Sequence, residues 1–552
     1  MTDFDLEPKQ VAYLPRSLAK AIGTLIPVNM ADAAQQALDS FESRNGNIDD
    51  YLVEKLGYTD RSQLYQHFSA EQVDGAALAI ASIESGKGFV IGDQTGIGKG
   101  RICAAVMRYA KEEGLEAIFI SQNPSLYADI VRDLQDIGMT DFNPWMTDAG
   151  KSIPLPNGTT LRTGNLEQQK EVMQGMMDAG LTGRDAIFTT YSQVQTVSGG
   201  VEPMRRAFLR AIAPNAILVL DEAHEAGGAV KNDWKGKNHA PDRAEFIREL
   251  VDASKGAFFS SATAIKRPDV IDLYARKTDL RHAVTDIDDL SFLLNEGGVP
   301  LQQMVAAGMV EGGDMRRLER SYEGISFKAE VVPVDRNVVE NLASAMRSIK
   351  EFDDAKRSGV MELKEQAKEQ AQAISEDNAI GQAGVSSSNF TSLMHNCISQ
   401  TLVALKAEET VQLVIGQLEN GEKPVIALSN TMGTVIKWYA EEHDVKQGDE
   451  INLSFADLLN RYLDRSRDII VKDYDGRSER RPLTGRELGS EGQQAFVDAR
   501  EIISSSDFST IPISPIDYIK SRLQEQGYSV GEITGRRETL QYQDDGTTTL
   551  KL

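Results

Sequence analysis

Short apolar runs alternate with amphipathic stretches between residues 61 and 285. The runs occupy residues 88–91, 117–121, 186–190, 215–220 and 257–260. Runs of this length suit strands that are buried on both faces of a parallel sheet. The amphipathic stretches between them suit helices that pack on such a sheet. The pattern therefore predicts an α/β fold, with a parallel sheet covered on both faces and joined by right-handed crossovers.

The rest of the chain is patterned differently. Residues 1–60 contain a helical stretch around 31–41 and are expected to form an accessory segment packed on the main domain. The pattern of residues 286–400 indicates long helices, and residues 381–389 have the composition of a flexible linker. This part is either a projecting helical insertion or a clamp over a bound nucleic acid. The expected division is 1–60, 61–285, 286–400 and 401–552.

The last part, 401–552, reads as a second α/β unit. A helix is expected over 401–418, and strands are expected at 425–431 and 528–534. Ser514 followed by Pro515 indicates the start of another helix, because serine is a good N-cap and proline suits the first turn.

A glycine-rich loop lies between the first apolar run and the helix predicted after it. It reads Gly-Asp-Gln-Thr-Gly-Ile-Gly-Lys-Gly-Arg from Gly92 to Arg101. A strand, such a loop and a helix in this order are typical of a phosphate-binding loop, whose N–H groups and helix N-terminus attract phosphate. Lys99 would contact the β- and γ-phosphates, while Gly100 stands where most such loops carry a magnesium-binding Ser or Thr. The residues expected to bind the nucleotide are Thr95, Gly96, Ile97, Gly98, Lys99, Gly100 and Arg101. An ordinary glycine-rich turn is the alternative.

An acidic box follows the run at 215–220. It reads Asp221-Glu222-Ala223-His224. Ligands of open α/β sheets bind at the carboxyl ends of the strands, so this pair lies where a catalytic site is expected. Asp221 would hold Mg²⁺, through water, and Glu222 would orient the attacking water. The alternative is an acidic helix N-terminus, which the helix dipole also favours.

Three further groups occur in the order that a nucleic-acid-dependent ATPase needs. Gln72 could recognise adenine through its amide, although a surface glutamine on an amphipathic helix has the same appearance. Polar residues at strand ends could grip a nucleic-acid backbone, although hydroxyls are common there in any α/β protein. These strand-end residues are Asn123, Pro124, Thr190, Tyr191 and Ser192. Ser261 and Thr263 could couple the ATP site to the nucleic-acid face.

Taken together, these motifs resemble the superfamily 2 helicases and, within them, the strawberry notch family of helicase-like ATPases. The similar segments are 92–101, 121–138, 190–192, 221–224 and 261–263, with weaker ones at 425–431, 511–515 and 532–536. The resemblance implies a P-loop NTPase with one RecA-like domain, a second, incomplete RecA-like domain and helical insertions. It also implies ATP and Mg²⁺ as cofactors, an interdomain coupling role for His224, and nucleic-acid contacts at Ser429 and Asn430. Phage and bacterial relatives are implied as readily as eukaryotic ones.

One feature of the superfamily is missing from the second half. No Gln-x-x-Gly-Arg-x-x-Arg box, which would supply an arginine finger, occurs there, and Arg536 and Arg537 match an earlier segment of the family. The chain is therefore expected to be a helicase interrupted in its second domain, or one half of a split protein. ATP binding should persist without the finger, whereas hydrolysis would be slow, because such fingers contribute about 10³–10⁵ in turnover.

Charge and composition narrow the choice of partner. The net charge of −24 opposes nucleic-acid binding unless basic residues gather along one groove. The candidate basic groups are Lys231–Lys237, Arg316 with Arg317 and Arg320, and Arg465–Arg481. No apolar run is long enough to span a membrane, and the two cysteines and six histidines show no metal spacing. A reducing cytoplasm, in a bacterium or a phage-infected host, is expected.

The sequence thus predicts an ATP-dependent superfamily 2 helicase or translocase acting on nucleic acid, with DNA favoured over RNA. A second polypeptide could supply the missing motifs. The first alternative is a nucleotide-gated binding or scaffold protein with little hydrolysis. The second is a P-loop kinase, which the ordered strand-end motifs and the size of the chain argue against.

Overall fold

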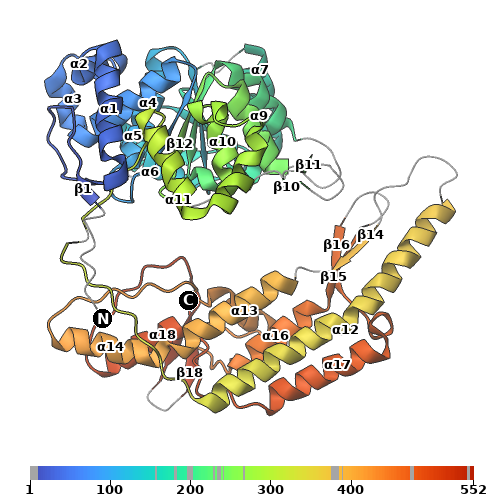
Figure 1. Ribbon diagram of the computed structural model, residues 1–552. Helices are drawn as coiled ribbons and strands as arrows, with labels where there is room; N and C mark the ends of the chain where they lie inside the picture. Colours follow the sequence, from blue (N-terminus) through green and yellow to red (C-terminus); the bar gives the residue numbers. More distant parts are fainter. Residues whose placement is uncertain are drawn as a thin grey trace. The chain divides into compact units, whose positions relative to one another are not determined.

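The computed structural model describes residues 10–155, 158–179, 183–194, 203–227, 231–232, 238–239, 242–264, 268–321, 323–374, 384–387, 390–472, 478–543 and 547–552 (Figure 1). The chain divides into two compact units, Met1–Ile325 and Ser326–Leu552. Each unit has its own hydrophobic core.

Unit 1 is built around a seven-stranded sheet with the order β13-β3-β12-β9-β4-β8-β5. Every neighbouring pair in it is parallel, as the sequence predicts. In this spatial order the strands are Met315–Arg316, Gly88–Ile91, Gly256–Ser260, Ala216–Asp221, Glu116–Ser121, Ala186–Thr190 and Pro144–Met146. Their apolar residues are almost completely buried, which explains the continuous rather than alternating pattern of the sequence.

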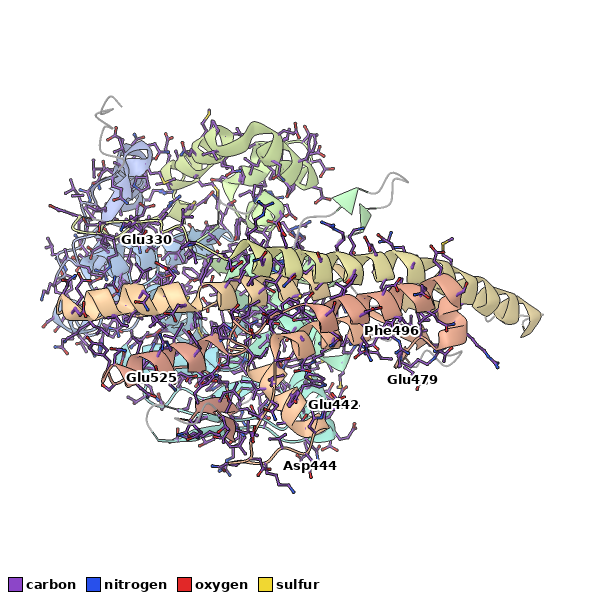
Figure 2. All side chains as sticks on the ribbon, turned by 90° about the horizontal axis from the view of Figure 1, so that it is seen from below. Glu330, Glu442, Asp444, Glu479, Phe496 and Glu525 are labelled. Atoms are coloured by element: carbon purple, nitrogen blue, oxygen red, sulfur yellow. The ribbon has the colours of Figure 1, made fainter. Side chains whose placement is uncertain are left out.

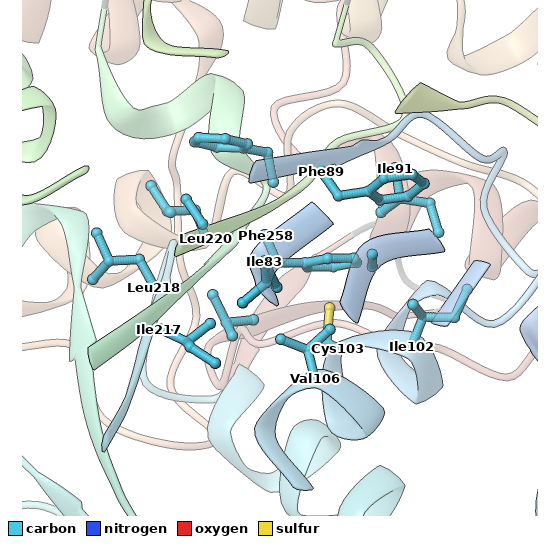
Figure 3. Packing of buried hydrophobic residues seen from close by; sticks show 14 of the residues in the cluster. Ile83, Phe89, Ile91, Ile102, Cys103, Val106, Ile217, Leu218, Leu220 and Phe258 are labelled. Carbon is cyan, nitrogen blue, oxygen red and sulfur yellow. The ribbon is translucent and has the colours of Figure 1, made fainter. Parts of the chain in front are cut away.

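Helices cover both faces of this sheet (Figure 1). Successive residues of a strand point to opposite faces, and Phe258 and Phe259 of β12 show this directly. Phe258 stacks on Phe89 of β3 at a centroid distance of 6.3 Å, on the face that Cys103 of α5 covers (Figure 3). Phe259 meets Tyr274 of α10 edge-on at 5.2 Å, on the other face.

The helices of unit 1 are α1 (Val28–Asn45), α2 (Ile48–Lys55), α3 (Arg61–His67), α4 (Ala70–Glu84), α5 (Lys99–Glu112), α6 (Leu126–Asp136), α7 (Leu166–Ala179), α8 (Met204–Ile212), α9 (Asp242–Ala253), α10 (Ile271–Ala275) and α11 (Leu290–Glu311). Helix α11 is kinked at Gly298, whose φ is 57°. Three short hairpins complete the unit: β1 (Gln10–Ala12) with β2 (Leu25–Pro27), β6 (Ser152–Pro154) with β7 (Thr160–Arg162), and β10 (Lys231–Asn232) with β11 (Asn238–His239).

Buried carboxylates of α4 hold the N-terminal segment against the sheet domain. Asp74 accepts hydrogen bonds from the Tyr13 hydroxyl at 2.8 Å and from the Ser17 backbone N–H at 3.0 Å. Glu71 accepts the backbone N–H of Ile22 at 2.9 Å. Because a buried carboxylate without partners is costly, these bonds fix the course of the segment.

Unit 2 contains α12 (Arg336–Ile374), α13 (Phe390–Leu405), α14 (Ala407–Glu419), α15 (Gly433–Glu442), α16 (Phe455–Ser466), α17 (Gly485–Ser505) and α18 (Pro515–Glu525). Its strands are β14 (Gly384–Ser387), β15 (Asp468–Lys472), β16 (Ser478–Pro482), β17 (Thr539–Tyr542) and β18 (Thr548–Lys551), and all their pairings are antiparallel. The long helices α12 and α17 pack together through Phe352 and Phe496, whose ring centroids are 5.2 Å apart. Helix α18 begins at Pro515 after Ser514, as predicted.

The two strands expected in unit 2 at 425–431 and 528–534 are not formed. Neither segment has regular secondary structure, and Ile426 and Val530 pack against the small cluster between α14 and α18. Val425 and Ile533, by contrast, are 93% and 102% exposed. A strand of a parallel sheet needs hydrogen-bonded neighbours and cover on both faces. The described residues supply cover on one face and no neighbouring strand.

The boundary between the two units falls after Ile325, whereas the sequence pattern suggested boundaries at 60, 285 and 400. The difference arises because α11 packs on α1, and β13 adds to the edge of the sheet beside β3. A strand of two residues is too short to recognise in the sequence.

The surface carries the acidic excess of the chain. The labelled carboxylates Glu330, Glu442, Asp444, Glu479 and Glu525 are all exposed (Figure 2). In the described part of the chain, no helix has both the length and the apolar character needed to cross a membrane.

A buried carboxyl makes unit 1 sensitive to pH. Burial raises the pKa of Asp314 to about 6, and its Oδ2 accepts the backbone N–H of Asp279 at 2.6 Å. A carboxyl whose pKa is higher in the folded than in the unfolded state favours the fold when it is protonated. This stabilisation is complete below the unfolded-state pKa of about 4 and is lost as the pH rises through about 6. Asp314→Asn, which can still accept the bond, should therefore be more stable than the wild type above pH 6.

The expected gain in free energy of unfolding is about 1–2 kcal/mol at pH 7 and should vanish below about pH 4. Urea unfolding at a series of pH values measures it. The exposed Glu311→Gln serves as the matched control and should show no such trend. An equal trend in both variants would show that Asp314 is not the responsible group.

Candidate nucleotide-binding site

Most of the sequence-predicted site residues of unit 1 lie at the carboxyl edge of the sheet. Parallel register places Ser260 beside Ile91 on one side and beside Asp221 on the other. The ends of β4 and β8 lie side by side in the same way, with Ser121 opposite Thr190. The glycine-rich loop after β3 and the acidic box after β9 therefore flank the end of β12, as expected for a ligand site in an open sheet.

The loop from Gly92 to Gly98 turns the chain from β3 into α5, which begins at Lys99. Gly96 and Gly98 have φ values of 87° and 98°, a region that favours glycine. Thr95 and Gly96 are exposed, and open space surrounds the position of a Cβ at Gly96. The Lys99 ammonium donates to the Asp93 carbonyl at 2.8 Å and so lies back along the loop.

Gln72 lies against this loop. It forms a capping box with Ser69 at the start of α4, in which the Ser69 backbone N–H donates to its Oε1 at 3.0 Å. Its Nε2 lies 3.4 Å from the Ile97 carbonyl oxygen. A Cβ at position 98 would stand closer than 3.0 Å to this nitrogen, so Gly98 makes room for the amide. Gln72 therefore lies against the loop, and the recognition of adenine by its amide stays a prediction.

A buried ion pair, which the sequence did not reveal, holds the loop from below. Arg316 of β13 is 1% exposed and donates to the Asp93 carboxylate and to the Glu71 carbonyl. Asp93 also accepts the backbone N–H of Leu318 at 2.9 Å. Arg316 was grouped with the basic residues of a nucleic-acid track. That interpretation is wrong, because its guanidinium is enclosed and neutralised inside unit 1.

Arg317 and Arg320, the other two members of that basic group, lie nearer the surface. The Arg320 guanidinium donates to the Gly96 carbonyl at 2.7 Å, and its backbone N–H donates to Gln94 Oε1 at 2.8 Å. Arg317 pairs with Glu319 at 2.6 Å. The strand β13 and the residues after it therefore line one side of the glycine-rich loop. Of the first basic group, residues 233–237 lie outside the described residues.

In the acidic box, the two carboxylates have different surroundings. Asp221 accepts the Ser260 hydroxyl at 3.2 Å, and burial, followed by the adjacent Glu222 charge, raises the pKa of its carboxyl. Glu222 has a left-handed backbone with φ 49°, and its side chain is 39% exposed. Backbone conformations of this kind cost free energy in a non-glycine residue and concentrate at functional sites. The turn separates an inward carboxylate from one that faces solvent.

The histidine of the box joins the neighbouring strand end. His224 Nδ1 lies 2.9 Å from the Ser261 hydroxyl oxygen and 3.2 Å from Glu222 Oε2. Ser261 in turn accepts the backbone N–H of Thr263 at 3.3 Å. His224, Ser261 and Thr263 are thus brought together, next to the acidic pair.

The strand-end residues expected to touch nucleic acid do not share one environment. Asn123 and Ser192 are exposed, and Pro124 is half-buried. Thr190 is 1% exposed and lies 3.0 Å from Ser192, oxygen to oxygen. Tyr191 is buried, and its hydroxyl donates to the Asp221 carbonyl at 2.9 Å, so it supports the acidic box from inside the domain.

The last two of these residues, Ser429 and Asn430, belong to unit 2. They precede α15, and Asn430 Oδ1 accepts the Met432 backbone N–H at 2.8 Å. Arg536, also in unit 2, is bound on both sides, by Asp517 at 2.6 Å and by Glu532 at 2.6 Å.

The residues of unit 1 fit a nucleotide with Mg²⁺. The exposed turn at Gly96 leaves space for phosphate, and the amino end of α5 points the helix dipole towards it. Asp221 offers the hard oxygen ligand that Mg²⁺ prefers, and this ion usually takes one or two carboxylates together with phosphate oxygens and water. Accordingly, the described residues contain no ready-made cluster of three metal-binding side chains.

A model of the family described as P-loop containing NTP hydrolase pore-1 matches residues 50–342. The chain belongs to this family. The match covers the whole sheet of unit 1, including the glycine-rich loop, the acidic box and β13. The fold class of this P-loop NTPase family, a parallel sheet with helices, is therefore the one predicted from the sequence.

The chain is also similar to strawberry notch proteins of animals. Protein strawberry notch of Drosophila melanogaster is 24% identical over 291 residues, which are 49% of this chain and 16% of that protein. The human strawberry notch homolog 1 is 24% identical over 360 residues, 62% of this chain and 23% of that protein. The matched segments thus span a quarter or less of these relatives. The resemblance to the strawberry notch family is confirmed.

Among solved structures, the chain is similar to the SWI2/SNF2 ATPase core of Sulfolobus solfataricus in complex with dsDNA. The TM-score is 0.31 and the sequence identity 15%, with 71% of this chain and 75% of that chain covered.

The ion pair under the loop yields a stability prediction. Arg316→Ala should lower the free energy of unfolding by about 3–5 kcal/mol, because it leaves Asp93 buried without its counter-charge. Arg317→Ala removes the same side chain at the next position, where it is partly exposed, and should change stability by less than about 1 kcal/mol. Urea denaturation followed by circular dichroism measures both. Similar losses in the two variants would contradict the burial of Arg316.

Proposed function

We propose that unit 1 binds ATP with Mg²⁺ and hydrolyses it, and that nucleic acid stimulates this hydrolysis. The observation that carries the proposal is the meeting of Lys99, Asp221 and Glu222 around the end of β12. These residue types at this edge would supply a phosphate-binding cation, an oxygen ligand for a metal, and a partly exposed carboxylate.

Each of these residues would have a separate task. Lys99 would leave the Asp93 carbonyl and neutralise charge on the β- and γ-phosphates. Asp221 would hold Mg²⁺, which supplies charge neutralisation at the phosphate oxygens. Glu222, exposed on its left-handed turn, would accept a hydrogen bond from the attacking water and place it in line. Because phosphoryl transfer depends mainly on placement and electrostatics, these three groups would account for most of the catalysis.

The coupling to nucleic acid would pass through His224 and Ser261. Their 2.9 Å contact joins the catalytic carboxylate turn to the end of β12. The exposed Asn123 and Ser192 at the neighbouring strand ends offer polar contacts for a phosphate backbone. The similarity to the family of strawberry notch proteins supports this helicase-like assignment. Movement along DNA, rather than RNA, is the form of the activity that we favour.

A nucleotide-gated scaffold with slow turnover is the second candidate. Arg536 and Arg537 are the nearest arginine pair in the sequence, although they match an earlier segment of the family and not the finger. The Arg536 guanidinium is bound by Asp517 and Glu532. A guanidinium fixed in this way cannot reach a γ-phosphate without breaking both pairs. Stimulated turnover would then need an arginine from elsewhere, for example from a second polypeptide.

The test is ATP turnover by the purified chain, alone and with single- or double-stranded DNA or RNA. We expect stimulation by nucleic acid that Glu222→Gln abolishes, while this variant retains ATP binding. Lys99→Ala should lose binding as well. Asp129→Asn, an exposed change on α6, is the control for general damage to unit 1.

Two outcomes would redirect the proposal. Tight ATP binding without turnover, with or without nucleic acid, would favour the nucleotide-gated scaffold. ATP binding that survives Lys99→Ala unchanged would place the nucleotide somewhere other than the loop, and the proposal would fail.

A further inference from the structure

Position 100 is glycine and carries no hydroxyl, and the Asp133 carboxylate lies where a side chain at this position would begin. A Cβ atom at Gly100 would stand closer than 3.0 Å to Asp133 Oδ2, a separation that real Cβ atoms do not show. The carboxylate of Asp133 therefore occupies the room into which a serine or threonine at position 100 would extend. Glycine at this position and aspartate at 133 are sterically complementary.

The end of α6 is fixed at this place by its neighbours. Asp136, one turn after Asp133, pairs with Arg101 at 2.6 Å, so the carboxyl end of α6 is joined to the amino end of α5. The Asp133 side chain is 18% exposed, and its Oδ1 lies 3.5 Å from Arg132 Nη2. Within the described part of the chain, its Oδ2 forms no hydrogen bond. This oxygen is free to serve as a ligand.

Asp133 of α6 and Asp221 of β9 lie on different elements, and the charges of both act on Cys103 of α5. Cys103, one turn into α5, is buried, and burial raises the pKa of its thiol. The carboxylates of Asp221 and Asp133 raise it further, and Lys99 opposes them. Asp221, Asp133 and Lys99 therefore all lie within electrostatic reach of one buried side chain in α5. The steric fit between Gly100 and Asp133 remains the geometric observation.

We propose that the Asp133 carboxylate replaces the usual loop hydroxyl as a ligand of the Mg²⁺ that accompanies the nucleotide, directly or through one water. The proposal rests on the proposed function, because it assigns a second protein ligand to the same site. Mg²⁺ prefers oxygen ligands and takes one or two carboxylates beside phosphate and water, so Asp133 and Asp221 together satisfy it. Sequence motifs do not reveal Asp133, since it belongs to the helix after β4.

Replacing a neutral hydroxyl with a carboxylate has a measurable consequence. Without the metal, Asp133 repels the phosphates and weakens nucleotide binding. With the metal, the same charge strengthens binding through the ion. The chain should therefore depend on Mg²⁺ for nucleotide affinity more strongly than a loop with a hydroxyl would.

The experiment measures the dissociation constant of a fluorescent, non-hydrolysable ATP analogue for the full chain, in excess Mg²⁺ and in EDTA. For the wild type we expect Mg²⁺ to tighten binding about tenfold or more, which corresponds to about 1.4 kcal/mol. Asp133→Asn should bind more tightly than the wild type in EDTA and lose most of the gain from Mg²⁺. Asp129→Asn, one turn earlier on the same helix and exposed, should behave as the wild type.

A swap of the two groups completes the design. Gly100→Ser combined with Asp133→Ala returns the hydroxyl and vacates the space it needs. This double variant should regain a Mg²⁺-dependent gain that Asp133→Ala alone lacks. Thermal unfolding of each variant shows whether it is folded, and the swap provides the test if Asp133→Asn is not.

The outcomes separate this proposal from the one before it. If Asp133→Asn keeps the full gain from Mg²⁺, or if the swap restores nothing to Asp133→Ala, the assignment of Asp133 is overturned while ATP binding stands. If the wild type does not bind the analogue, or if Lys99→Ala binds it equally well, the proposed nucleotide site is wrong. The assignment of Asp133 as a metal ligand is then wrong as well.

Discussion

The buried pair between Arg316 and Asp93 is the constraint on which unit 1 depends. A carboxylate in the loop and a guanidinium on the edge strand are both removed from water, and each satisfies the other. Arg316 also donates to the backbone of α4, next to the carboxylates that hold the N-terminal segment. One charge pair therefore ties together the loop, the edge of the sheet and α4. The Glu71 and Asp74 carboxylates of α4 in turn bind the segment from Tyr13 to Ile22. The position of the glycine-rich loop therefore depends on this buried network as well as on its glycines.

Much of unit 1 could be predicted from the sequence because its signals are local. Continuous apolar runs indicate buried parallel strands, and a glycine-rich loop between a strand and a helix indicates a phosphate-binding turn. The start of α18 at Pro515 was predictable for the same reason, since capping depends on adjacent residues. Unit 2 was less predictable. The segments 425–431 and 528–534 have strand-like composition, but a strand exists only with neighbours, and sequence composition does not supply them.

In the candidate site, too, the residues found from local motifs differ from those that only the structure reveals. Lys99, Asp221 and Glu222 were identified from motifs, and the structure brings them to one edge. Arg316 was misread as a surface charge, because its burial depends on Asp93, which is distant in the sequence. Asp133 was not noticed, because its meaning comes from the missing side chain at Gly100. Residues such as Arg316 and Asp133, whose surroundings depend on a residue far away in the sequence, can be recognised only from the three-dimensional structure.

The N-terminal segment has a practical consequence for anyone expressing this protein. Tyr13, Ser17 and Ile22 supply the donors that neutralise buried acceptors on α4. A recombinant fragment that starts at the family match, near residue 50, would discard those donors and leave Glu71 and Asp74 enclosed without them. Such a fragment would tend to be insoluble even though every motif of the nucleotide site is intact. Cloning boundaries for crystallisation or assays should therefore lie before β1.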